Sequence, residues 1–241
     1  MSRARIQLQP AWVLKASAYS DTSLLVEAFT PSHGRIGLVA RGARTAKSRP
    51  RALLQAFRPL LLSWTEAGDL GTLTGVEASP AAAFEFRGET VFSGWYLNEL
   101  LLRLLQRHDA HPVLFEAYGE ALAALIPTGE RALRRFEMTL LAELGFGIDL
   151  PPDLDPSLHY FHRNGEEPVP GAADAEDSYS GRTLIALRDD QLETVEDLRA
   201  ARRLLRGALA EHLGTKGLST ATMLRDLRRS LERVPTPGSG S

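Results

Sequence analysis

The chain contains no cysteine among its 241 residues. Disulfide bonds, thiolate zinc sites and cysteine nucleophiles are therefore excluded. No apolar run approaches the roughly 18 residues that a membrane-spanning helix needs. The amino terminus also lacks the apolar core and cleavage site of a secretory signal. We expect a cytoplasmic protein with no membrane partner.

The common catalytic motifs are also missing. The sequence has no G-x-x-x-x-G-K-[ST] loop, no G-x-S-x-G elbow and no H-E-x-x-H helix. His159 and His162 have a metal-like spacing and lie near several carboxylates of residues 153–167. Two histidines do not define a site, so a plain surface strand is the favoured interpretation. We expect no enzyme, no metal and no cofactor, and a metal enzyme built on these residues remains an alternative.

Acidic residues are scarce in two parts of the chain, although the formal net charge of the whole chain is −2. Residues 28–65 hold seven basic side chains and no acid, and residues 199–233 hold nine basic side chains against three acids. Residues 136–197 are the reverse, with fifteen acids and three bases. This separation indicates an anionic partner that meets only part of the surface.

The first 80 residues have the pattern of a small β-barrel. Short runs rich in Val, Leu, Ile, Thr and Trp are separated by turn signals such as Pro31-Ser32-His33-Gly34. Five strands in this length fit an OB-fold; the runs cover residues 11–17, 23–30, 34–42, 57–66 and 70–78. The long connection between the third and fourth strands carries most of the first basic block, and its sequence allows a helical turn.

From about residue 81 apolar residues recur every three or four positions, as they do on one face of a helix. The pattern predicts helices over residues 89–108, 112–126, 129–145, 194–214 and 220–233. Thr128 and Thr194 are the expected N-caps of the third and fourth helices. The predicted class is therefore α+β: an OB-fold barrel over residues 1–80 and a helical domain over 81–234, with an irregular acidic insertion at about 150–180 and a disordered tail at 235–241.

Arginines cluster on two of the predicted helices. Arg199, Arg202, Arg203 and Arg206 recur at helical spacing, and Arg134 lies in a similar group on the helix of residues 129–145. Arginine beside an apolar cleft can hold a carboxylate in a bidentate fork. Salt bridges to neighbouring acids explain the same pattern equally well.

Several stretches resemble one bacterial family, the RecO recombination mediators. The resemblance is carried by "SLLVEAFT", "VARGART", "LRRFEMTLLAELGFGIDL" and "LRAARRLLRGALAEHLG", and it preserves the order of the family's parts along nearly the whole chain. Many relatives carry a four-cysteine zinc module in the region of residues 150–180. This chain has none and so resembles the zinc-free branch. It also has Ser219, Thr220 and Ala221 where relatives often have Lys/Arg-Ser-Arg.

The resemblance implies a non-enzymatic, nucleoid-associated protein that binds single- and double-stranded DNA and anneals complementary strands. It further implies action with RecR to load RecA onto DNA coated by the single-strand-binding protein (SSB). The family's contact with the acidic SSB C-terminal tail carries over to Arg134, Arg199 and Arg203 of this sequence.

The basic segment supplies the expected DNA contacts, because Arg and Lys neutralise phosphates without reading bases. These residues are Arg35, Arg41, Arg44, Lys47, Arg49 and Arg51. Trp12, Phe29 and Trp64 are possible base-stacking residues, but a core role is favoured for each. An OB-fold RNA-binding protein without annealing activity remains the alternative, since phosphate contacts do not separate RNA from DNA.

Overall fold

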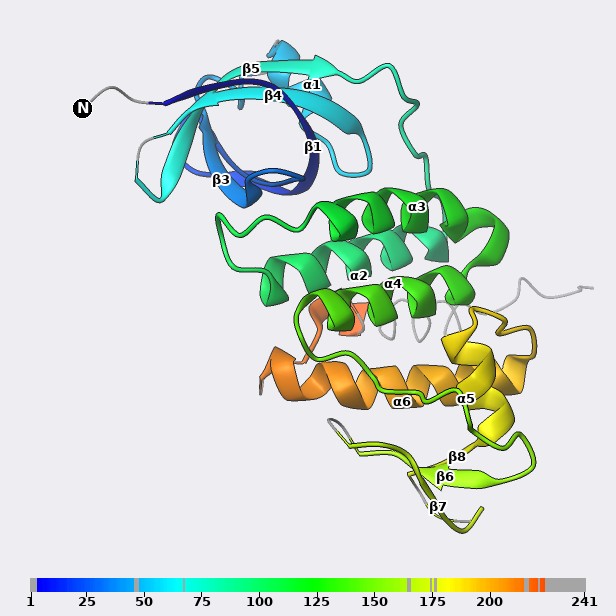
Figure 1. Cartoon of the computed structure of the whole chain (residues 1–241). Coiled ribbons are helices and arrows are strands. Elements are labelled where there is room, and N and C mark those ends of the chain that lie inside the picture. The colour runs from blue at the N-terminus through cyan, green and yellow to red at the C-terminus, as the bar shows by residue number, and fades with distance from the viewer. Residues whose placement is uncertain are drawn as a thin grey trace, which may run out of the picture.

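The computed structural model describes residues 4–45, 48–66, 68–163, 166–173, 175, 177–214, 217–220 and 222–223. A β-barrel is followed by stacked helices and a small sheet at the far end (Figure 1). The barrel consists of β1 (Arg5–Ala18), β2 (Leu24–Thr30), β3 (Gly34–Ala40), β4 (Pro59–Thr65) and β5 (Leu70–Ala78), with α1 (Arg49–Leu53) between β3 and β4.

The five strands close in the order β1-β2-β3-β5-β4, with β3 and β5 parallel and the other pairs antiparallel. β1 closes the ring because its two ends pair with different neighbours, β2 and β4. This topology confirms the predicted OB-fold, including a helical turn in the connection before β4. β1 begins at Arg5, earlier than the predicted residue 11. The added part alternates polar and apolar residues as a strand does, but it is largely exposed and Pro10, which has no amide hydrogen for a strand ladder, interrupts the pattern.

Alternation along β1 divides the core of the molecule in two. Ala11 and Val13 point into the barrel, whereas Trp12 and Leu14 point outward and belong to the core of the helical domain. The barrel therefore shares one hydrophobic cluster with the helices. Polar contacts reinforce this junction: Asn98, 1% exposed, donates to the Leu14 carbonyl oxygen at 2.9 Å and accepts from the Tyr118 hydroxyl at 2.5 Å.

A glycine allows the second contact between barrel and helices. Gly34 has a φ of +60°, and a Cβ there would lie 1.8 Å from the Asp109 carbonyl oxygen. Only glycine fits both this backbone conformation and this approach. The turn before β3 consequently packs against the loop that follows α2, where the His108 amide donates to the Arg35 carbonyl oxygen at 3.0 Å.

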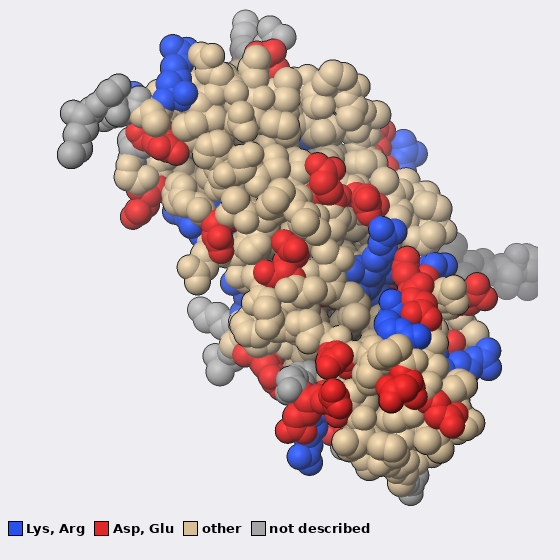
Figure 2. Space-filling model, viewed as in Figure 1, with Lys and Arg blue, Asp and Glu red and all other residues tan. Residues whose placement is uncertain are grey.

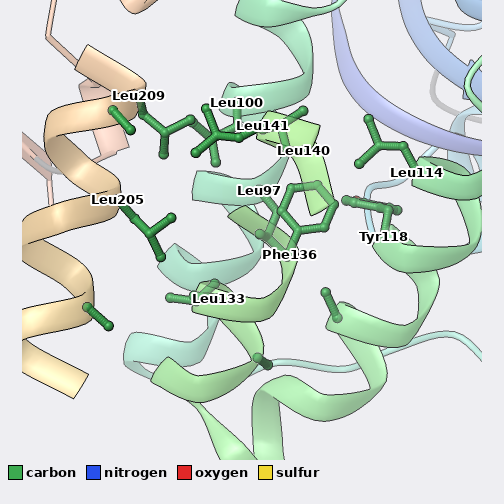
Figure 3. Close-up of a cluster of buried hydrophobic side chains, with 14 of the residues drawn as sticks. Leu97, Leu100, Leu114, Tyr118, Leu133, Phe136, Leu140, Leu141, Leu205 and Leu209 are labelled. Atoms are coloured by element: carbon green, nitrogen blue, oxygen red, sulfur yellow. The ribbon is translucent and has the colours of Figure 1, made fainter. Parts of the chain in front are cut away.

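The long helices are α2 (Glu89–Leu104), α3 (Pro112–Thr128), α4 (Glu130–Glu143) and α6 (Val195–Leu213). Figure 3 shows their shared core, where Leu97 and Leu100 of α2 and Phe136 and Leu140 of α4 lie between Tyr118 of α3 and Leu205 of α6. All four helices confirm sequence predictions. The predicted helix over 220–233 and the tail at 235–241 lie almost wholly outside the described residues, which include helical Ser219 and Thr220.

One predicted helix cap is confirmed and one is wrong. Thr194 caps α6, because its side chain accepts from the Asp197 amide at 3.0 Å. Thr128 does not cap α4; its hydroxyl donates to the Ala124 carbonyl oxygen at 2.9 Å inside α3. Gly129, with a φ of 48°, takes the N-cap position without a side-chain bond. The chain turns so tightly between α3 and α4 that Thr128 is still part of the earlier helix.

The predicted irregular insertion contains a small sheet. Its strands are β6 (His159–Phe161), β7 (Val169–Pro170) and β8 (Ser178–Ser180), in the order β7-β6-β8, and α5 (Gly181–Arg188) follows directly. The strands are too short to show a period in the sequence. Tyr160 and Tyr179 hold the sheet against the helical core. Acidic side chains are frequent over this end of the molecule in Figure 2. No described helix is long and apolar enough to cross a membrane.

Candidate functional site

The connection between β3 and β4 presents cations to solvent. Arg41, Arg44 and Arg51 are exposed, and within the described part of the chain none of them forms an ion pair with a carboxylate. Lys47 lies outside the described residues, as does the side chain of Arg49. Unpaired, exposed guanidinium groups are free to contact an anion such as a phosphate backbone. We call Arg41, Arg44, Lys47, Arg49 and Arg51 the basic segment.

Hydrogen bonds tie the basic segment to the turn between β1 and β2. The Arg44 amide donates to the Thr22 carbonyl oxygen at 2.9 Å, and the Arg44 guanidinium donates to the carbonyl oxygen of Ser20. Arg51 donates to the Arg44 carbonyl oxygen at 3.2 Å, and Ser48 caps α1. The cations are thus carried on a connection that Arg44 anchors to the β1–β2 turn and that its own hydrogen bonds hold in shape.

Arg35 has a different environment from the other predicted DNA-binding residues. Its guanidinium bonds to Glu27 at 3.1 Å and to the Leu105 carbonyl oxygen at 3.1 Å, and Arg107 also pairs with Glu27. The side chain of Arg35 is only 18% exposed. Its contacts join β2 and β3 to the loop after α2, so the structure places Arg35 in the junction and apart from the basic segment.

The three aromatic residues considered for base stacking are buried. Trp12, Phe29 and Trp64 are 7%, 0% and 2% exposed, which agrees with the favoured core role. The exposed aromatic side chain of the barrel is Tyr19, at 55%. Sequence reasoning missed it, although its position in the polar turn Tyr19-Ser20-Asp21 leaves it few apolar neighbours.

A second site lies in the helical domain, where a cavity of about 270 Å³ opens between α2, α4 and α6. Phe92 and Leu133 contribute apolar surface, and the cavity's cationic side chains are Arg134, Arg202 and Arg206. Glu130 and Glu137 also line it, along with Leu218 and Thr220 of the chain that follows α6. We call this space the arginine cavity.

Arg134 is the residue with the least usual environment in this cavity. It is 4% exposed, and its Nη2 atom bonds to Glu137 Oε1 at 2.7 Å. Its Nε and Nη1 atoms have no hydrogen-bond partner among the described residues. A buried donor without a partner costs about 1–3 kcal/mol, and more for a charged group. An anion entering the cavity would supply the missing acceptors.

Burial shifts the pKa of the groups beside Arg134. Burial raises the pKa of Glu137, and the charge of Arg134 partly opposes that rise. Burial and the neighbouring Glu137 together hold the pKa of Tyr96 well above its ordinary value. The Tyr96 hydroxyl therefore stays protonated and donates to Glu137 Oε1 at 2.5 Å. Glu137 accepts from Nη2 of Arg134 only, and Nε and Nη1 have no acceptor among the described residues.

The arginine stripe of α6 divides between two environments. Arg202 and Arg206 line the cavity, and Arg202 pairs with Glu130 at 3.3 Å. Arg203 instead donates to the Ser178 carbonyl oxygen at 2.9 Å and lies 4.7 Å above the Tyr179 ring. Arg199 is exposed and does not line the cavity. Successive residues turn by about 100° around a helix, so Arg202 and Arg203 face different neighbours.

The Ser-Thr sequence after α6 has a structural role. Glu99 of α2 accepts bonds from the Ser219 amide at 2.7 Å and the Thr220 amide at 2.9 Å, and from both hydroxyl groups. Burial alone would raise the pKa of Glu99, but these bonds from Ser219 and Thr220 lower it overall. They fix Leu218 and Thr220 at the wall of the arginine cavity.

His159 and His162 do not form a metal site. They begin and follow β6, and side chains three residues apart on an extended strand point to opposite faces. His162 is 6% exposed, and burial lowers its pKa. Among the described residues no group of three or more His, Asp and Glu side chains could hold a metal ion. A separation of three residues brings two side chains to one face of a helix but not of a strand, and the strand that the sequence predicts here is partly buried rather than a plain surface strand.

The fold and the basic segment indicate the class of nucleic-acid-binding proteins. A closed OB-fold barrel with a basic loop is typical of nucleic-acid-binding proteins, and a buried arginine in an apolar cavity suits the carboxylate of a peptide.

Comparison with known proteins identifies the family. Residues 1–81 match the family described as Recombination protein O N terminal, and residues 86–220 match Recombination protein O C terminal. The chain is 43% identical to the DNA repair protein RecO of Nitrosococcus oceani, with 93% of this chain and 95% of that protein covered. It is 41% identical to RecO of Alkalilimnicola ehrlichii, with 99% and 98% covered. The chain therefore belongs to the RecO family of DNA repair and recombination proteins, which are mediators and not enzymes.

Proposed function

We propose that this chain binds single- and double-stranded DNA through the basic segment and anneals complementary strands. With RecR, it helps to load RecA onto SSB-coated DNA, and the SSB C-terminal tail binds in the arginine cavity. Membership of the RecO family supports this proposal. The observation that carries the DNA-binding part is the group of exposed, unpaired arginines on the barrel.

Annealing by this surface requires no catalytic group. Two complementary strands repel each other through their phosphates, and exposed cations reduce that repulsion while the bases pair. The acidic residues concentrated in residues 136–197 lie mostly in the helical part of the chain. Like charges repel, so DNA is favoured on the barrel.

The observation that carries the tail-binding part is the buried Arg134 with two unpartnered nitrogen atoms. The terminal carboxylate of a peptide can accept from one of these nitrogens, while an apolar side chain fills the space beside Phe92 and Leu133. Arg202 and Arg206 at the rim would then meet the acidic residues of the tail. We propose these two in place of Arg199 and Arg203, which lie outside the cavity.

We also propose that the chain belongs to the zinc-free branch of the family. It has no cysteine, and the region of residues 150–180 packs through Tyr160 and Tyr179. Metal analysis of the purified protein is expected to give far less than one zinc per chain. A stoichiometric zinc content would contradict this assignment.

The DNA-binding proposal is tested by fluorescence anisotropy with a labelled dT oligonucleotide over a salt series. Five phosphate contacts predict a log–log slope of about −3.5, or a loss of roughly a hundredfold between about 50 and 200 mM salt. The variant Arg44→Ala/Lys47→Ala/Arg49→Ala should reduce the slope by about two and impair annealing.

The matched control is Arg87→Ala/Arg163→Ala/Arg182→Ala, which removes three exposed arginines outside the basic segment. It should bind and anneal as the unmodified protein does. An unchanged slope in the first variant would contradict the proposed surface. Equal affinity for RNA of the same length, without annealing, would favour an RNA-binding function instead.

A further inference from the structure

The first 80 residues of the chain, which contain the barrel, include five Phe, Tyr and Trp residues. Four of these five are core residues. Trp12, Phe29, Phe57 and Trp64 are each 7% exposed or less. Tyr19 alone is exposed, at 55%. An aromatic ring on the surface of a single-strand-binding protein is suited to base stacking, which tolerates any sequence because every base has a π-face.

Tyr19 is held next to the basic segment by backbone contacts. The Tyr19 amide donates to the Ser23 carbonyl oxygen at 3.0 Å and closes the turn between β1 and β2. Arg44 bonds to Thr22 and to Ser20 of the same turn. The ring and the cations are therefore carried by two connections that are joined to each other.

A shallow hollow adjoins this turn. It has a volume of about 530 Å³ and lies between Ala16 and Leu24, at the ends of β1 and β2, and Arg51, Ala52 and Gln55 around α1. Its lining combines Ala and Leu side chains with the polar Ser48, Arg51 and Gln55, a mixture that suits contact with a base or sugar. Ala18 pairs with Leu24 in the β1–β2 ladder, so Tyr19 follows a residue whose strand partner lines the hollow.

We propose that Tyr19 stacks on a base of single-stranded DNA whose phosphates contact the basic segment. This inference rests on the proposed DNA binding by that segment. It adds a base contact to a surface that otherwise meets only phosphates, and bases are open to stacking in single strands but not within a duplex. Tyr19 therefore confers a preference for single strands over duplexes.

The test uses three labelled probes: a dT oligonucleotide, an abasic oligonucleotide of the same length and charge, and a duplex. Tyr19→Ala should weaken dT binding by roughly 5- to 150-fold, the range measured for loss of one stacked base. Binding of the abasic strand and of the duplex should not change. The salt slope with dT should also stay the same, because no phosphate contact is lost.

Two control variants complete the design. Tyr19→Phe keeps the ring and should bind dT as the unmodified protein does. Phe146→Ala removes a 48%-exposed ring from the helical domain and should leave all three probes unaffected. The inference would be overturned if Tyr19→Ala bound dT normally, or if its binding of all three probes were weakened by the same factor.

Failure of the underlying function gives a different result. If Arg41→Ala/Arg51→Ala weakens all three probes while Tyr19→Ala changes none, the basic surface stands and only stacking is refuted. If the arginine variant changes none of the probes, DNA binding by the basic segment is refuted and the stacking proposal falls with it.

Discussion

The basic segment and the arginine cavity use the same side chain in opposite surroundings. Arg41, Arg44 and Arg51 are exposed and have no described carboxylate partner, whereas Arg134 is 4% exposed and bonds to Glu137. Exposed charges act weakly and additively, and salt screens them. A buried charge acts through a few directed bonds in low dielectric. The first arrangement suits a long anion of any sequence, and the second suits one carboxylate at one position.

The largest expected effect comes from removing the buried charge. Arg134→Ala leaves Glu137 buried without its cation, and breaking such a pair typically costs about 3–5 kcal/mol of stability. Burial already raises the pKa of Glu137. In the variant Glu137 can therefore take up a proton and lose its charge, so the loss of stability should lie near the lower end of this range. Tail-peptide binding should weaken by about 2–5 kcal/mol. Urea unfolding and calorimetric titration measure the two effects.

Two controls separate binding from folding in this experiment. Arg134→Met/Glu137→Gln removes both charges, so stability should largely return while tail binding stays lost. A tail peptide with an amidated C-terminus should bind the unmodified protein as poorly as the carboxylate peptide binds the variant. Normal binding by the double variant would show that Arg134 does not hold the tail.

A smaller effect is expected at the rim, where α6 offers a matched comparison. Arg202→Ala/Arg206→Ala removes two cations that line the cavity, and Arg199→Ala/Arg203→Ala removes two from the same helix outside it. Exposed pairs contribute about 0.2–1 kcal/mol each, so the first variant should bind the tail peptide severalfold more weakly. The second should bind it almost normally, and a greater loss there would reverse our assignment.

The smallest effect concerns the wall of the cavity and depends on pH. The folded-state pKa of Glu99 is lowered, so its contribution to stability is complete above the ordinary glutamate value of about 4.3 and disappears as pH falls through the folded-state pKa. Solvent screening limits this contribution to below about 1 kcal/mol. Thermal unfolding of Glu99→Gln should therefore differ from that of the unmodified protein at neutral pH and converge with it in acid. A constant difference would contradict the role of the carboxylate charge.

The barrel and the long helices were predictable because their apolar periods extend over many residues. The arginine cavity was only partly predictable. Sequence spacing places Arg199, Arg202, Arg203 and Arg206 on one side of a helix, but it does not reveal which neighbour each one meets. Arg202 faces α4 and Arg203 faces β8, a difference that tertiary packing decides.

Other features gave too weak a signal to be found in advance. The strands β6 to β8 have two or three residues each, too few for a period to appear. Tyr96 and Glu137 belong to different helices, 41 positions apart, and only their packing brings them together. Tyr19 was detectable in principle, as an aromatic residue in a polar turn.

The most direct test of two separate anion sites measures two probes against two variants. The probes are a dT oligonucleotide and an SSB tail peptide, and the variants are Arg44→Ala/Lys47→Ala/Arg49→Ala and Arg134→Met/Glu137→Gln. We predict that the first variant loses salt-dependent DNA binding and keeps the tail, and that the second loses the tail and keeps DNA. Loss of both probes in either variant would contradict the division of the molecule into a DNA-binding barrel and a tail-binding helical domain.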